Sequence, residues 1–476
     1  MVEPTPSGHS EKSESVPSKI EDQPSLTAEI AGTKSGSGYR QELERTLELR
    51  HLVVYGMIFM VPIAPWAVYG FVSRASFGMV PLVYLVGIVA MLFTALSYKQ
   101  LSGAFPVAGS VYSYVQRGLN PYVGFIAGWM ILADYLLIPA LIYTFSANWL
   151  QGLMPGVPTF VWVLAFVVFN TAVNILGIRL QARANFVLLV VELIALGVFI
   201  ALAIDFVFVR GRGAGGWSVA PFYQPQHLNW NFVATATSIA ALSFLGFDAI
   251  STLAEETREP CKAIGNATVL SLLLLGAIFM VETYLAALVH PDYATLGAKL
   301  GFFQIARQVG GPALYVALIL VNVIAAGIAN ALAAQSAISR ILYSMGRDRV
   351  LPGAGFLARV HPRWKTPVNA TLLVAVLSVL LALTIPEEAL LKLVNFGALT
   401  AFMLLNVTVF VYFYIKQHRH RQVFRYVLFP LLGLLIVAFV WSGFDRITFL
   451  IGGSWLALGL ILGAARRKHL VPLELP

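Results

Sequence analysis

The sequence has one cysteine and few charged residues for its length. Only 12% of its 476 residues are charged, about half the fraction usual in soluble proteins, whereas 58% are hydrophobic. The single cysteine, Cys261, excludes a disulfide framework and a zinc site built from cysteines. Because one soluble core could not bury so much apolar surface, the composition indicates a protein that is solvated by lipid.

The positive net charge of +9 does not indicate nucleic-acid binding. Most lysines and arginines lie in short segments between apolar runs, as in the cytoplasmic loops of membrane proteins. No cleavable signal peptide is visible, because the N-terminus is polar and rich in Ser, Glu, Pro and Lys. This composition predicts a disordered cytoplasmic tail over residues 1–45.

About a dozen apolar runs are long enough to cross a bilayer. The sequence therefore predicts an all-α polytopic membrane protein. The loops richest in Lys and Arg alternate so that both termini lie in the cytoplasm, with the spans in the plasma (inner) membrane. The predicted spans are residues 52–73, 79–97, 122–150, 158–177, 184–209, 231–254, 264–289, 311–339, 368–385, 389–415, 424–441 and 447–465.

Two of these spans contain helix-breaking residues. In the first, Pro62 and Pro65 cannot donate, so the carbonyls of about Ile58 and Val61 are expected to lose their helical partners. In the sixth, Gly246 gives the backbone freedom to unwind. Breaks five spans apart suit a five-plus-five inverted repeat and indicate the central site of a transporter. The alternative is that these residues only kink ordinary bundle helices.

Four motifs stand out along the chain: Tyr98 to Tyr114, Gly246 to Thr257, Ser339 to Asp348, and His361-Pro362 with Thr366-Pro367. They resemble those of the amino acid–polyamine–organocation transporters. Five stretches narrow the resemblance further: Gly128-Trp129, Asp134 to Leu136, Trp217 to Phe222, Ser243 to Asp248, and Asn395 to Leu399. In these stretches the chain is most similar to the bacterial putrescine importers of that family. The resemblance implies a LeuT-type fold, with a ten-helix core over residues 46–415 and two peripheral helices with a short tail over 416–476. It also implies a small organic amine as the substrate.

One departure from the family pattern bears on the substrate. Most amino-acid permeases of the family have a glycine-rich break in the first span, whose amides hold the substrate carboxylate. Here the break is Val61 to Trp66, so two amide donors are missing while carbonyls that accept from an ammonium remain. The predicted substrate-binding residues are Ile63, Ala64, Trp66, Asp134, Phe244, Gly246, Phe247 and Asp248.

Two carboxylates among these residues are open to two interpretations each. Asp248 follows the break in the sixth span, where it either caps the second half-helix or pairs with the substrate amine. Asp134 lies midway along the third span, where it either satisfies groups near Pro139 or faces the central cavity. Phe244, Phe247 and Trp66 are candidates for cation–π walls, or for simple packing.

Two further carboxyl groups lie inside predicted spans. Glu192 has only apolar neighbours along its helix, so it is expected to face the protein interior. Several proton-coupled relatives carry a lysine at about this place, which favours proton coupling by Glu192 over a structural hydrogen bond. Sodium coupling is disfavoured, because the stretch around Gly327 in the eighth span has no hydroxyl groups. Glu282 is expected to pair with a neighbouring helix.

The sequence therefore predicts a secondary transporter for a small amine, coupled to protons, with no cofactor and no metal. The rival within the same fold is an amino-acid permease or exchanger. A membrane-embedded enzyme is disfavoured, because the eight histidines form no metal or nucleophile constellation at span depth. A receptor or channel would not explain the paired breaks.

Overall fold

A computed structural model describes residues 45–106, 110–176, 181–227, 229–347, 354–364 and 366–465. These residues form helices joined by loops, with one isolated bridge between Leu47 and Thr257. The predicted all-α fold class is therefore confirmed. The tail predicted over 1–45 lies outside the described residues except for Arg45, as does Asp348 of the third family motif.

The first span is broken where its prolines predicted a break. Helix α2 (Leu49–Met60) ends directly before Val61, α3 (Ala64–Ala75) begins after Ile63, and the two helices are bent by 47°. Val61 has a φ of 59°, which is unusual for a β-branched residue. Pro65 lies in the first turn of α3, where the missing N–H has no helical partner to lose.

The sixth span is broken at Gly246, as predicted, but its second half has an unexpected winding. Helix α9 (Trp230–Ala240) continues into the 3-10 turn η2 (Ala241–Phe244), and Gly246 then has a φ of 113°. The half that follows, η3 (Phe247–Glu256), is a 3-10 helix of 10 residues. Such helices rarely exceed three or four residues, and longer stretches often mark a hinge.

Every other predicted span coincides with a helix. Ten helices in the described part are long and apolar enough to cross a membrane, and the bent pair α2–α3 adds another. The predicted span 368–385 corresponds to the shorter apolar helix α14 (Val368–Thr384). The remaining span helices are α4 (Val80–Ala104), α6 (Pro121–Leu153), α7 (Thr159–Leu176), α8 (Gln181–Ile204) with η1 (Asp205–Val209), α10 (Pro260–Val289), α11 (Gly301–Asn322) with η5 (Val323–Asn330) and α12 (Ala331–Arg347), α15 (Glu387–Val409) with η6 (Phe410–Lys416), η8 (Phe424–Leu428) with α16 (Phe429–Trp441), and α17 (Arg446–Ala465).

Several helical segments were not predicted. Helix α11 begins at Gly301 instead of residue 311, but Gly311 has a φ of 72° and precedes Pro312, so the predicted start marks a kink. The other unpredicted segments are short helices in the loops. They are α5 (Ser110–Gly118), η4 (Tyr293–Thr295), α13 (Ala354–Leu357) and η7 (His420–Gln422).

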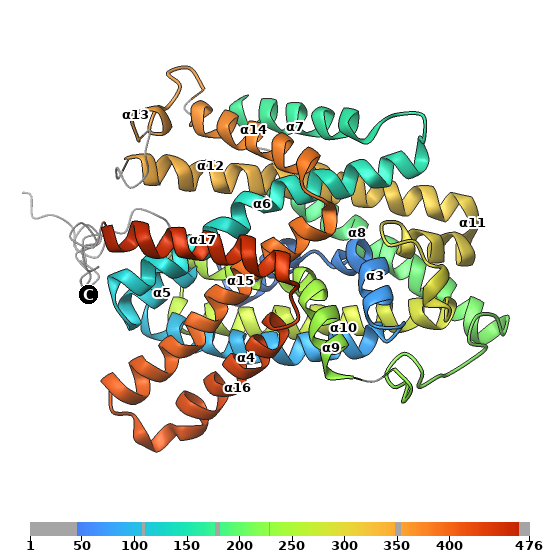
Figure 1. The fold of residues 1–476 in the computed structure, drawn as a ribbon, viewed down its shortest axis with the longest axis horizontal. Coiled ribbons are helices and arrows are strands. Elements are labelled where there is room, and N and C mark those ends of the chain that lie inside the picture. Colours follow the sequence, from blue (N-terminus) through green and yellow to red (C-terminus); the bar gives the residue numbers. More distant parts are fainter. Residues whose placement is uncertain are drawn as a thin grey trace, which may run out of the picture. The chain divides into compact units, whose positions relative to one another are not determined.

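The helices bury a shared core and leave apolar side chains on the outside. The most extensive helix contacts are those of α4 with α10 and of α6 with α15, while α7, α12 and α14 lie side by side (Figure 1). Val168, Val376 and Ile461 are each more than 60% exposed on outer helices. So many exposed apolar side chains require a lipid environment, which makes the chain a multi-pass membrane protein.

Candidate functional site

The two helix breaks meet backbone to backbone. A Cβ atom at Gly246 would lie 2.6 Å from the carbonyl oxygen of Phe59 and 3.1 Å from the amide nitrogen of Met60. Gly246 also has a φ of 113°, which side-chain-bearing residues rarely adopt. Glycine is therefore required here both by its conformation and by the close approach of α2.

The break in the first span exposes carbonyls, though not all of those expected. The Val61 amide donates to Met57, and the Ala64 amide turns back to donate to the Val61 carbonyl at 3.0 Å. The expectation that the Val61 carbonyl is free is therefore wrong, because Ala64 supplies the donor that Pro65 lacks. The carbonyls of Ile58, Phe59 and Met60 receive no backbone hydrogen bond from the described residues.

The carboxylate of Asp248 lies at the start of the second half-helix of the sixth span. Its Oδ1 accepts from the Gly246 amide at 3.3 Å, and its Oδ2 accepts from the Ser110 hydroxyl at 3.4 Å. The N-cap residue of η3 is Gly246, so the interpretation of Asp248 as the N-cap residue is wrong. The Asp248 carboxylate is nevertheless stabilised by backbone amides at the start of the half-helix, because those of Asp248 and Ala249 act together with that of Gly246.

Asp134 is a second buried carboxylate that interacts electrostatically with Asp248. It lies on α6 with 7% of its surface exposed, and its Oδ1 has no hydrogen-bond partner among the described residues. Tyr135 interacts electrostatically with both carboxylates. No lysine or arginine of the described chain forms an ion pair with either of them. The two carboxylates thus interact with each other, and neither has an ion-pair partner among the described residues.

Two residues of the first family motif complete the surroundings of Asp248. The Tyr98 hydroxyl lies 3.3 Å from the Ser110 hydroxyl, and Tyr98 interacts electrostatically with Asp248. Both residues stand within the motif that carried the resemblance. Nothing in their spacing, however, predicted that α4 and α5 bring them to the sixth span.

The predicted aromatic residues are buried in ring clusters. Phe247 contacts Tyr98 and Phe402 at centroid distances of 5.7 and 5.4 Å. Phe244 lies against Tyr84 at 5.7 Å, and its exposed fraction is zero. In the described structure these rings pack against other rings.

Asn395 holds the end of the first half of the sixth span. Its Nδ2 donates to the carbonyls of Ser238 and Ile239, at 2.7 and 3.3 Å, near the point where α9 ends. Its Oδ1 is buried without a hydrogen-bond partner in the described structure. The sequence singled out Asn395 only as part of a family motif, because the partners of a side-chain amide cannot be derived from spacing.

Trp66 and Glu282 are joined by a buried hydrogen bond. The Trp66 indole N–H donates to Glu282 Oε2 at 2.8 Å, and the Trp66 ring stacks on Phe302 at 4.7 Å. The expected pairing of Glu282 with a neighbouring helix is therefore confirmed, with α3 as the partner. Of the other residues predicted in this break, Ile63 is buried directly before α3 and Ala64 is the first residue of α3.

Glu192 faces the protein interior, as expected. Only 6% of its surface is exposed, whereas Ile194 on the same helix is 61% exposed. Among the described residues, Glu192 has no ion pair. Near the hydroxyl-free stretch of the eighth span, the helix widens into the π-helix η5, and the Gly327 carbonyl accepts from Asn170 Nδ2.

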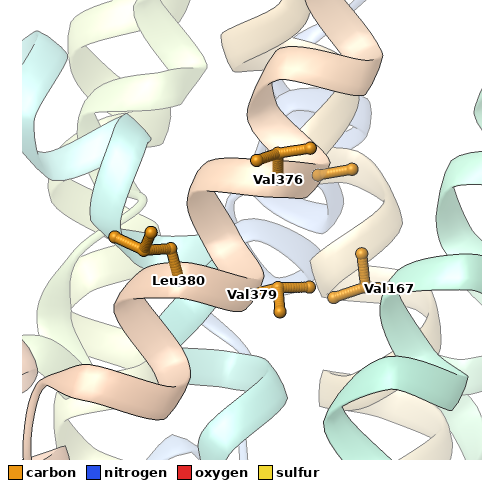
Figure 2. Close-up of a pocket in the computed structure, with 5 residues that line it drawn as sticks. Val167, Val376, Val379 and Leu380 are labelled. Carbon is orange, nitrogen blue, oxygen red and sulfur yellow. The ribbon is translucent and has the colours of Figure 1, made fainter.

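An apolar pocket of about 370 Å³ lies apart from these residues. Val376, Val379 and Leu380 of α14 line it together with Val167 of α7 (Figure 2). None of the predicted site residues lines this pocket, and it offers no polar group to a charged substrate.

Comparison with known proteins relates the chain to membrane permeases. A family model described as amino acid permease matches residues 52–452. The low-affinity putrescine importer PlaP of Escherichia coli is 35% identical to this chain over 434 residues, which cover 90% of the chain and 95% of the importer.

Two relatives of lower identity are named for other substrates. The branched-chain amino acid permease BcaP of Bacillus subtilis is 28% identical over 414 residues, covering 81% of this chain and 85% of the permease. The methylthioribose transporter of Bacillus subtilis is 26% identical over 463 residues, covering 92% of this chain and 96% of the transporter. All three relatives move small molecules. With its helix breaks and its apolar spans, the chain thus belongs to the amino acid permease family, within the amino acid–polyamine–organocation transporters.

Proposed function

We propose that this protein imports a small organic amine, such as putrescine, across the plasma membrane by alternating access around its two helix breaks. The observation that carries the proposal is the pair of buried, interacting carboxylates, Asp134 and Asp248, neither of which has an ion-pair partner among the described residues. A positively charged partner stabilises a buried carboxylate, and the ammonium groups of the substrate supply one.

The surroundings of the breaks support an amine over an amino acid. The carbonyls of Ile58, Phe59 and Met60 are acceptors that suit an ammonium group. Pro62 and Pro65 remove donors that a substrate carboxylate would need. Two carboxylates also match the two ammonium groups of a diamine, and PlaP of Escherichia coli is named as a putrescine importer.

The proposal includes the coupling ion and the arrangement in the membrane. Glu192 is the coupling carboxyl group, because it is buried without an ion pair among the described residues and a proton can neutralise it. Both termini lie in the cytoplasm. Residues 46–415 form the inverted-repeat core, and the segment 416–476 contributes the two peripheral helices. The close approach of the two breaks at Gly246 supports their role as the centre of that core.

The second candidate function is an amino-acid permease or exchanger of the same family. The similarity to the branched-chain amino acid permease BcaP favours it. An amino-acid substrate would place its carboxylate close to Asp248, however, where the two negative charges repel each other.

Uptake by proteoliposomes tests the proposal. Labelled putrescine, a monoamine of the same length and a panel of amino acids are offered to the wild-type protein and to Asp134→Asn. We expect uptake of the diamine, and a larger rise in its KM than in that of the monoamine when Asp134 is neutralised. Uptake of amino acids without any uptake of amines would contradict the proposal and favour the second candidate.

A further inference from the structure

A second place that suits an ammonium group lies where α6 ends and α15 begins. Asn148 stands near the C-terminal end of α6, and Glu387 is the first residue of α15. The Asn148 Nδ2 donates to Glu387 Oε2, so the side chains hold each other in place. We call this pair, Asn148 and Glu387, the amine cradle.

The cradle is occupied by the side chain of Lys299. The Lys299 ammonium donates to Asn148 Oδ1 at 3.3 Å and lies 3.7 Å from Glu387 Oε2. The side chain of Lys299 is 55% exposed, whereas that of Glu387 is only 4% exposed. The buried side chains of Asn148 and Glu387 thus bind the ammonium end of a lysine side chain that is otherwise exposed.

Lys299 does not use every hydrogen-bond acceptor of the cradle. Glu387 Oε1 is buried and has no hydrogen-bond partner among the described residues. Lys392, four residues after Glu388, does not meet this need, because it lies 2.7 Å from both Glu388 and Asp445. The cradle therefore has capacity for a ligand that carries more than one N–H donor.

The position of the cradle relates it to the central site. It stands on α6 and α15, the same helices that carry Asp134 and Asn395. The 14 residues from Asp134 to Asn148 correspond to about 21 Å along an α-helix. The charge pattern of the loops predicts that this end of both helices faces outward.

We propose that the amine cradle is an outer binding site for primary alkylammonium ions, which displace Lys299 before they reach the central site. A lysine side chain ends in a primary alkylammonium group, so Lys299 shows by its own contacts which chemical class the cradle recognises. As a tethered competitor, it has a high local concentration, so free amines bind only when they displace it. The identity of the transported amine rests on the proposed function, but the displacement of Lys299 does not.

Removal of the tethered competitor tests this site. Binding of labelled putrescine is measured on the purified full-length protein carrying Asp248→Asn, which weakens the central site, with and without Lys299→Met. We expect Lys299→Met to lower the half-saturating putrescine concentration at least threefold, and the further change Glu387→Gln to abolish the gain. Lys299→Gln is a second variant of the same kind, in case the methionine variant folds poorly. Lys392→Met is the matched control, since it removes a lysine of α15 that does not contact the cradle.

Two results decide between a binding site and a structural ion pair. If Lys299→Met and Lys299→Gln leave putrescine binding unchanged and only lower the melting temperature, the ion pair is structural and the inference is overturned. If Asp248→Asn does not weaken binding, the proposed central site fails. Putrescine binding that is strengthened by Lys299→Met and weakened again by Glu387→Gln would then still support the cradle.

Discussion

The indole of Trp66 and the carboxyl group of Glu282 form a buried hydrogen bond between residues 216 positions apart in the sequence. It joins α3, the second half of the first broken span, to α10. Glu282 also interacts electrostatically with Tyr84, whose hydroxyl lies 2.8 Å from that of Ser243 in η2. One buried carboxyl group is thus connected to both broken spans.

Loss of the indole donor should destabilise the protein. Trp66→Phe leaves both oxygens of Glu282 without a donor among the described residues, at a cost of about 1–3 kcal/mol. We expect a lower melting temperature for Trp66→Phe, and partial recovery when Glu282→Leu is added, because the unpaired group is then removed. Thermal unfolding of both single variants and the double variant measures the coupling. Additive effects would show that the hydrogen bond does not contribute.

Neutralisation of Asp248 should weaken amine binding selectively. Loss of one partner of a buried ion pair costs about 3–5 kcal/mol, which corresponds to more than two decades in affinity. We therefore expect Asp248→Asn to raise the KM for amine uptake at least tenfold, with a much smaller effect on a neutral analogue. Equal losses for both ligands would mean that the mutation acts by disturbing the start of η3.

Substitution of Glu192 should separate transport from coupling. Glu192→Gln keeps the size and the hydrogen-bonding groups but removes the proton that can be exchanged. We expect accumulation of substrate against its gradient to fail, while substrate exchange across the proteoliposome membrane continues. In the wild type, uptake should follow an inward proton gradient and ignore sodium replacement. Undiminished accumulation by the variant would make Glu192 a structural residue.

A methyl group at Gly246 should disturb the contact between the two breaks. Gly246→Ala places a Cβ atom 2.6 Å from the Phe59 carbonyl oxygen and forces alanine into a φ of 113°. The expected destabilisation exceeds about 1 kcal/mol, and uptake should fall with it. Gly453→Ala in α17 is the matched control, because no atom lies within 4 Å of the added Cβ. Equal melting temperatures and uptake rates for the two variants would disprove the importance of this contact.

Helix α17 is attached to the third span by a reciprocal tryptophan pair. The indoles of Trp129 and Trp455 each donate to the carbonyl of the other residue, at 2.9 and 3.1 Å, and their rings stack at 4.5 Å. Trp455→Phe removes one hydrogen bond, so we expect a lower melting temperature with an unchanged KM. Ile461→Ala, on the exposed face of α17, should change neither quantity. A raised KM for Trp455→Phe would show that α17 acts on the site.

The sequence predicted those features whose causes are local. Pro62 and Pro65 have no backbone N–H in any conformation, so the position of the first break was predictable to within a residue. The fate of the Val61 carbonyl was not, because it depends on how the Ala64 amide turns in three dimensions. Apolar runs likewise predicted the spans. The first part of α11 was not predicted, because Gly311 and Pro312 separate it from the apolar run that follows.

Contacts between distant segments could not be predicted from one sequence. Burial of Asp134 and Asp248 followed from their position inside apolar spans, whereas their mutual interaction depends on where the fold places α6 and η3 in three dimensions. The same holds for Asn148, Lys299 and Glu387, which lie in three separate parts of the chain. Hydrophobic periodicity shows that a helix face is buried but not which helix covers it.

The 3-10 winding makes η3 longer than an α-helix of the same ten residues. A 3-10 helix rises about 2.0 Å per residue and an α-helix 1.5 Å, so ten residues would shorten by about 5 Å on rewinding. The far end of η3 is tied to the start of α2, where the Leu47 amide donates to the Glu256 carbonyl and Arg258 pairs with Glu48 at 2.9 Å. Rewinding of η3 into an α-helix would therefore move the beginning of the first span along the axis of η3 through these two contacts.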